Sequence, residues 1–146
     1  MKKTDLAYIA GIIDGEGCIG LRRETLRRKD KKYATVRLYV SVSNTNEWLL
    51  QWLRFSFRGS LAPCPRKNHQ RLAWEWCIVF KQARAFLEAI YPYLRIKKPQ
   101  AEIALRFQKA KKYGGRGHYK TDGERAVEEA QRILISNLNI KGKRVI

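Results

Sequence analysis

The chain has 146 residues, with 31 lysines and arginines against 13 aspartates and glutamates, and a formal net charge of +18. This length predicts a single domain with an ordinary core, and the chain has no apolar run of about 18 residues that could span a membrane. So large a positive charge favours a polyanionic partner, above all nucleic acid, over an acidic membrane surface. The three cysteines, Cys18, Cys64 and Cys77, are too far apart for a C-x-x-C zinc pair. Their odd number argues against a complete disulfide framework, so we expect reduced cysteines and an intracellular protein.

The first predicted element is a helix that Thr4 or Asp5 can cap and that runs to about Asp14. Its apolar residues recur at helical spacing, whereas another face is small because it carries Ala7, Ala10 and Gly11. Asp14 and Glu16 follow where the apolar run stops. A carboxylate at this end of a helix is repelled by the negative end of the helix dipole, so another interaction must favour an acid at this position. Binding of a divalent cation would be such an interaction.

Residues 18–44 change from helical to alternating periodicity. Val36, Leu38, Val40 and Val42 fall on one side and Thr35, Arg37, Tyr39 and Ser41 on the other, which predicts a half-buried strand. Its partner is expected at about 18–28, with the basic run 27–32 as the connecting loop.

Further elements are predicted in the order helix, hairpin and three helices. The first helix covers 47–57, the hairpin strands cover 60–66 and 71–80 with a turn at 67–70, and the next helix covers 82–94 and is kinked or ended by Pro92. Pro99 starts a helix to about Tyr113, residues 114–118 break it, and Thr121 or Asp122 caps a last helix to about Leu138. His118, in that break, is expected to be an exposed histidine.

Residues 9–17, with the sequence IAGIIDGEG, resemble the nine-residue signature of the LAGLIDADG homing endonucleases. Ile9 replaces the first Leu of the family name, and Glu16 replaces the second Asp. The resemblance implies an α+β fold of layout αββαββα, in which DNA lies on a saddle-shaped antiparallel sheet. It covers about residues 5–108 of a single domain, 1–146, whose remainder, about 109–146, is expected to be a C-terminal helical accessory.

The resemblance also implies the active site and the assembly. In the family, the signature helix packs against its twin on a two-fold axis, so a homodimer is expected, with Ala7, Ala10, Gly11 and Asp14 at the interface. Glu16 would bind catalytic metal together with the carbonyl of Gly15. Mg²⁺ suits such oxygen ligands, and Mn²⁺ or Ca²⁺ would substitute for binding. Asn44 would help to organise active-site water, and Lys97, or Lys98 as the second choice, would approach the scissile phosphates.

Alternation along the strands predicts which side chains face the DNA. Arginine can bind guanine through two hydrogen bonds, and the other polar side chains suit phosphates or base edges. The expected contacts are Arg22, Glu24, Arg37, Tyr39 and Ser41 on the first hairpin, Arg27, Arg28, Lys29, Lys31 and Lys32 at its tip, and Arg66, Asn68, His69, Gln70, Arg71, Trp74 and Trp76 around the second. For the two tryptophans, packing in the core is an equal alternative. The basic tail, 141–144, would either reach the DNA backbone or be disordered.

The predicted function is site-specific, metal-dependent cleavage of both strands of double-stranded DNA, as in intron homing. One signature per chain makes half a site, and a dimer would span about twenty base pairs of a roughly palindromic sequence. Two alternatives of the same fold are an RNA-splicing maturase, with intron RNA as a partner, and a non-catalytic DNA-binding protein. Glu16 and Lys97 favour the nuclease. A ribosomal RNA-binding structural protein would explain the charge but not the signature. The expected compartment is the cytoplasm of a bacterium, or a chloroplast or mitochondrion.

Overall fold

The computed structural model describes residues 1–65, 71–111 and 120–140, with the backbone alone at positions 26, 28, 31 and 33. The elements follow in the order α1 (Lys3–Glu16), β1 (Gly17–Arg28), β2 (Lys31–Asn44), α2 (Glu47–Phe57), β3 (Ser60–Cys64), β4 (Ala73–Val79), α3 (Phe80–Ile90), the 3₁₀ helix η1 (Tyr91–Tyr93), α4 (Lys98–Ala110) and α5 (Asp122–Leu138). The elements α1 to α3 thus have the predicted αββαββα layout, and further helices follow.

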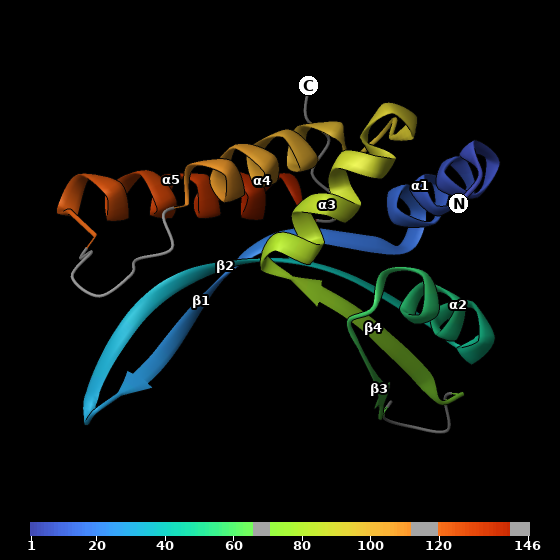
Figure 1. Cartoon of the computed structure of the whole chain (residues 1–146), viewed down its shortest axis with the longest axis horizontal. Coiled ribbons are helices and arrows are strands. Elements are labelled where there is room, and N and C mark those ends of the chain that lie inside the picture. The colour runs from blue at the N-terminus through green and yellow to red at the C-terminus, as the bar shows by residue number, and fades with distance from the viewer. Residues whose placement is uncertain (66–70, 112–119, 141–146) are drawn as a thin grey trace.

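The strands form one antiparallel sheet in the order β1-β2-β4-β3. β1 and β2 pair along their whole length, from Gly17 opposite Val42 to Arg28 opposite Lys31. β4 then joins the second half of β2 to β3. Figure 1 shows a curved sheet with the helices on its convex side and no drawn helix on the concave side. We call this concave side, in the described part of the chain, the open face.

Alternation along β2 sorts its side chains between the two faces, as predicted. The valines and leucine at 36, 38, 40 and 42 are buried toward the helices, where they meet Ile9 and Ile13 of α1 and Phe86 of α3. The intervening residues lie on the open face. The core therefore sits between the sheet and the helices, and the open face takes no part in it.

Trp76 belongs to this core, so its predicted contact with DNA is wrong. Its side chain is fully buried, its ring lies 5.3 Å from that of Phe86, and its Nε1 donates a hydrogen bond to the carbonyl oxygen of Arg58 at 2.7 Å. Trp74 is on the same face and is partly buried against the core. The alternative of core packing is therefore the correct one for both tryptophans.

α1 begins earlier and ends later than expected. Lys2 precedes its first turn, and the Asp5 carboxylate accepts the Lys2 N–H at 3.2 Å, so Asp5 acts from within the first turn and is not the cap residue itself. At the other end, the helix continues through Asp14 to Glu16.

The tip of the first hairpin is tighter than the predicted loop at 27–32. The strands run to Arg28 and from Lys31, and only Lys29 and Asp30 form the turn, with φ of 45° and 65°. Positive φ at both central residues is typical of the type I′ turn, whose twist matches that of the strands.

The remaining boundaries differ by a few residues. β3 and β4 are shorter than predicted, and α3 starts at Phe80. The predicted turn at 67–70 and the break at 114–118 lie outside the described residues. Pro92 lies in η1, directly after α3, which confirms that it ends this helix. Thr121 caps α5 by accepting the Glu124 N–H at 3.2 Å.

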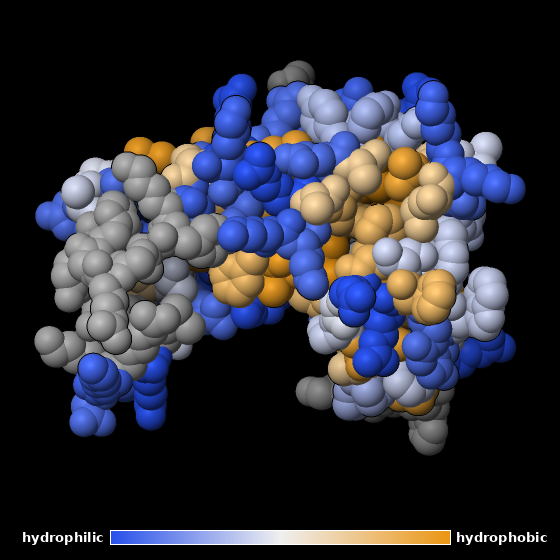
Figure 2. Space-filling view, viewed as in Figure 1, coloured by the Kyte–Doolittle hydropathy of each residue, from blue (hydrophilic) through white to orange (hydrophobic). Residues whose placement is uncertain are grey.

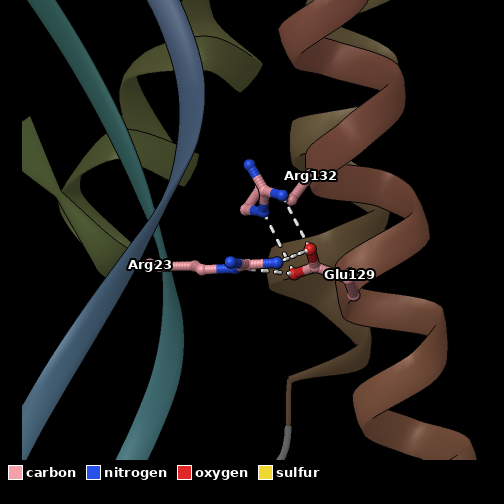
Figure 3. Close-up of polar contacts among 3 residues, drawn as sticks. All are labelled: Arg23, Glu129 and Arg132. Atoms are coloured by element: carbon pink, nitrogen blue, oxygen red, sulfur yellow. Dashed lines mark hydrogen bonds and ion pairs between the residues drawn. The ribbon is translucent and has the colours of Figure 1, made fainter.

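α5 is held against β1 by charged side chains. Arg23 of β1 and Arg132 of α5 both donate hydrogen bonds to the carboxylate of Glu129 (Figure 3). The hydrogen bonds from Arg132 and then from Arg23 lower the pKa of Glu129 to about 2. Ile135, six residues after Glu129 on the same helix, is buried in the core. No helix in the described part of the chain is long and apolar enough to cross a membrane.

Candidate functional site

Asp14 is explained by contacts within its own chain. Its carboxylate accepts the backbone N–H groups of Arg95, Ile96 and Lys97 at 2.8, 3.2 and 2.9 Å. These hydrogen bonds explain an acid at the end of α1 without a cation, because they stabilise the charge of Asp14 and hold the segment 95–97 against it. The carboxylate is turned to that segment, although the resemblance implied that Asp14 lies at the dimer interface.

The side chain of Lys97 also contacts the end of α1. Its Nζ donates to the carbonyl oxygens of Ile13, Asp14 and Gly17 at 2.8, 3.2 and 2.6 Å, which puts a positive charge at the negative end of the α1 dipole. The ammonium of Lys98 instead lies 5.4 Å from the centre of the Tyr91 ring. Of the two lysines, the structure therefore brings Lys97 to the end of α1. Its contact with phosphate stays a prediction.

Glu16 ends α1 with an exposed side chain. Asn44, the last residue of β2, donates its Nδ2 to Oε2 of Glu16 at 2.5 Å, and its Oδ1 accepts the N–H of Asn46 at 2.7 Å. Asn46 caps α2 in turn. Glu16, Asn44 and Lys97 are far apart in sequence, yet they come together around the end of α1. Their catalytic roles stay predictions.

The fit of a metal ion can be judged from the donors at this end of α1. Glu16 offers one exposed carboxylate, and backbone carbonyls such as that of Gly15 are further oxygen donors of the type that Mg²⁺ prefers. Among the described residues, no group of three or more His, Cys, Asp or Glu is placed to hold an ion. The residues therefore fit magnesium only where water, phosphate or a second chain supplies the rest of its shell.

The open face carries the side chains that alternation predicted. Figure 2 shows a hollow on the lower side of the molecule, bordered by both hydrophilic and hydrophobic residues. The outward residues are Cys18, Gly20, Arg22 and Glu24 of β1, Thr35, Arg37, Tyr39, Ser41 and Ser43 of β2, and Glu75 and Cys77 of β4. Arg22 and Arg37 give this face two cations near its centre.

Contacts within the chain hold both arginine side chains in place. The guanidinium of Arg22 lies 4.2 Å from the centre of the Tyr39 ring. Nη1 of Arg37 lies 3.0 Å from Oε1 of Glu24, and both side chains remain about a quarter exposed. The Arg37 Nε is buried and has no hydrogen-bond partner within the described residues. The exposed quarter of the Arg37 side chain is the part that can contact an acceptor from outside the chain.

Tyr39 lies flat on the open face. A Cβ added to Gly20, its partner in the hairpin register, would lie 2.6 Å from the Tyr39 ring, so only glycine fits beneath it. The hydroxyl lies 3.4 Å from Sγ of Cys18, and burial followed by this hydrogen bond raises the pKa of Tyr39 to about 12. The hydroxyl points to Cys18, and the ring lies against the guanidinium of Arg22. The contact of Tyr39 with DNA stays a prediction.

The other predicted contacts divide into described and undescribed ones. Arg27, Lys29, Lys32 and Arg71 are exposed. The side chains at 28 and 31 and the whole of Arg66, Asn68, His69 and Gln70 lie outside the described residues. Sequence reasoning missed Glu75, whose carboxylate accepts the Ser43 hydroxyl at 3.4 Å on the open face. Alternation from the inward Trp74 and Trp76 would have placed it there.

Comparison with known proteins identifies the fold. No family model and no curated protein sequence matches this chain. The homing endonuclease I-CvuI, solved with the I-CreI target DNA and magnesium, superimposes with a TM-score of 0.72 at 24% identity, over 99% of this chain and 87% of that one. The archaeal intron-encoded homing endonuclease I-Vdi141I, solved with DNA, gives 0.71 at 14% identity, over 100% and 91%. The homing endonuclease I-TnaI gives 0.51 at 19% identity, over 97% and 89%.

Proposed function

We propose that this chain, whose fold is that of the LAGLIDADG homing endonucleases, is a homodimeric, magnesium-dependent endonuclease that cuts both strands of a long, roughly palindromic DNA site. The observation that carries the proposal is the exposed carboxylate of Glu16 at the C-terminal end of α1, with Asn44 and Lys97 beside it. A protein that only binds DNA has no use for a carboxylate directed toward phosphates, because the two repel each other.

The reaction is hydrolysis of a phosphodiester bond. The oxygen of water bonds to phosphorus, the bond to the 3′ oxygen breaks, and the leaving oxygen takes up a proton. Glu16 and the Gly15 carbonyl would hold magnesium, which supplies activation of water and stabilisation of charge on the phosphate. Asn44 orients the Glu16 carboxylate through its hydrogen bond. Lys97 adds positive charge at the end of α1, where negative charge develops on the phosphate.

The homodimer is supported by the exposed side of α1. Ala7, Gly11 and Gly15 follow one another at one-turn spacing and are exposed, and a Cβ added to either glycine meets none of the described residues within 4 Å. Small residues let two helices approach closely. Ala10 was expected on this surface, but that prediction is wrong, because its side chain is fully buried in the core of its own chain. Gly15 takes its place in the stripe.

The test is cleavage by Glu16→Gln. The amide is nearly isosteric but lacks the charge that holds the cation, so we expect double-strand cleavage of a randomised DNA library to fall roughly a hundredfold or more. Affinity for the selected site, measured by gel shift in Ca²⁺, should be unchanged or higher. Glu88→Gln on α3 is the matched control and should cut like the wild type. Undiminished cleavage by the Glu16 variant would contradict the assignment of the metal ligand.

The alternative is a protein of the same fold that binds without cutting, as a maturase acting on intron RNA or as a DNA-binding protein. The net charge of +18 suits that role equally. It predicts that the wild type and the Glu16 variant both bind and that neither cuts any member of the library in Mg²⁺ or Mn²⁺.

A further inference from the structure

The outward face of α2 carries aromatic side chains that no contact within the described chain accounts for. Trp48 is 76% exposed and Phe55 is 90% exposed. They lie seven residues apart, hence two turns apart on one side of the helix, opposite the buried Leu50 and Leu53. Exposed apolar surfaces of this kind mark interaction sites.

The aromatic face of α2 is continuous with the exposed side of α1. Trp52, one turn after Trp48, is partly buried, and its ring centre lies 6.1 Å from that of Tyr8. Tyr8 is 59% exposed, and Gly11, one turn further along α1, belongs to the small stripe. Figure 1 shows α1 and α2 at the same end of the molecule. One apolar surface therefore extends across both helices.

The charge of the two helices indicates what can dock there. Within a chain of net charge +18, α1 and α2 together hold only two cations, Lys3 and Arg54. Away from the end of α1 that carries Asp14 and Glu16, they hold two acids, Asp5 and Glu47. Because these charges cancel, the surface has no net positive charge to attract a nucleic acid or an anionic membrane. It is also where a second strongly cationic copy can approach with the least repulsion.

We propose that Trp48, Trp52 and Phe55 of α2, together with Tyr8, bind the corresponding surface of a second copy of this chain, on either side of the contact between the two α1 helices. The inference rests on the homodimer of the proposed function and assigns it an aromatic flank. A two-fold interface uses the same surface on both copies, so one aromatic cluster per chain supplies both sides. Buried aromatic side chains are the residues that contribute most to binding at such interfaces, whereas the glycine stripe offers close approach but little area.

The experiment compares Phe55→Ser with Leu134→Ser in the full chain. Leu134 is a matched control, because it is also an exposed apolar residue, 55% exposed, on a helix elsewhere in the fold. Sedimentation across a dilution series should show the dimer dissociation constant rise at least about tenfold for Phe55→Ser and stay within about twofold for Leu134→Ser. Circular dichroism should be unchanged for Phe55→Ser, because its side chain is almost fully exposed. Trp48→Ser should weaken the dimer in the same direction.

The outcomes separate this inference from the proposed function. If Phe55→Ser and Trp48→Ser both self-associate like the wild type, the aromatic flank is refuted, whereas the cleavage test on Glu16 stands. If they lower DNA affinity and leave self-association intact, the surface binds DNA and the inference is also refuted. A wild type that stays monomeric throughout and still cuts both strands refutes the dimer and the flank together.

Discussion

Two acids of the signature have different tasks in this chain. Asp14 binds backbone N–H groups of the segment 95–97, whereas Glu16 is left exposed and oriented by Asn44. The side chain of Asp14 thus fixes Lys97 beside the end of α1.

At Asp14, we expect Asp14→Ala to lower the free energy of unfolding by roughly 2 kcal/mol, because N–H groups that bonded to a charged acceptor lose it while partly shielded from water. Urea denaturation measures this loss. Asp5→Ala is the control, since that carboxylate accepts one exposed N–H and should cost less. An equal loss at both positions would mean that the segment 95–97 gains nothing particular from Asp14.

Arg37 should determine sequence preference. Because its guanidinium is held by Glu24 on the open face, Arg37→Ala should remove roughly 1–3 kcal/mol of discrimination at one position in each half-site. Arg27→Ala at the exposed hairpin tip should weaken all sequences alike. Binding selection from a randomised library distinguishes the two. A uniform loss from Arg37→Ala would show that it contacts phosphate.

Local pattern singled out Glu16, whereas Asn44 and Lys97 were implied only by the resemblance to the LAGLIDADG family. Glu16 could be predicted because an acid after an apolar helix is unusual. Ala10 was misplaced because residues 6–13 are apolar or small on nearly every side of the helix, so periodicity does not reveal which side faces the sheet. That orientation is set by packing against residues far away in sequence, among them Val42 and Phe86.

At the scale of elements, α1 has one side in the core and one side that is exposed. Gly11 lies on the exposed side, where an added Cβ has no neighbour within 4 Å among the described residues. This asymmetry allows dimerisation to be tested without disturbing the fold.

Gly11→Leu should therefore separate folding from assembly. Replacing glycine within a helix should stabilise the monomer by up to about 0.8 kcal/mol. The added side chain should also keep the paired helices apart, lower the dimer content in sedimentation and abolish double-strand cleavage. Thermal unfolding at a concentration below dimerisation checks the first effect. Retention of a wild-type dimer by this variant would exclude α1 from the interface.

The attachment of α5 should depend on pH. The folded-state pKa of Glu129 is depressed to about 2 from 4.5, so its contribution to stability is fully present above pH 4.5 and is lost as the pH falls toward 2. The Glu129 side chain is about a third exposed, and screening by solvent makes the effect small. Melting temperatures of the wild type and Glu129→Gln should differ slightly at pH 6 and converge near pH 2. A difference that does not change with pH would contradict the ion-pair origin.

The order of elements was predictable because alternation and helical spacing are local. Alternation placed the buried valines of β2 correctly, and helical spacing gave the bounds of α2, Glu47–Phe57. The hairpin tip was not predictable, because its turn places Lys29 and Asp30 at positive φ and has no glycine to signal it. Their conformation follows from the twist of the flanking strands.

At the scale of the whole molecule, the helices occupy one side of the sheet, and the opposite side carries fixed arginines (Figure 1). If a dimer neutralises roughly ten phosphates, log affinity should fall with log salt at a slope of about −9. Gel shifts over a salt series measure it. Arg27→Ala should reduce the slope slightly. A slope near −2 would mean that few phosphates are contacted despite the charge.

Strand alternation also has a consequence for how such a chain can change over time. The side chains at positions 36, 38, 40 and 42 of β2 are buried in the core, whereas those at 35, 37, 39, 41 and 43 face outward. Substitutions at Thr35, Arg37 or Ser41 can therefore accumulate without loss of folding, while each one alters the surface offered to a ligand. Recognition and stability thus depend on alternating residues of the same strand, so the sequence can diverge toward a new target while the fold stays the same.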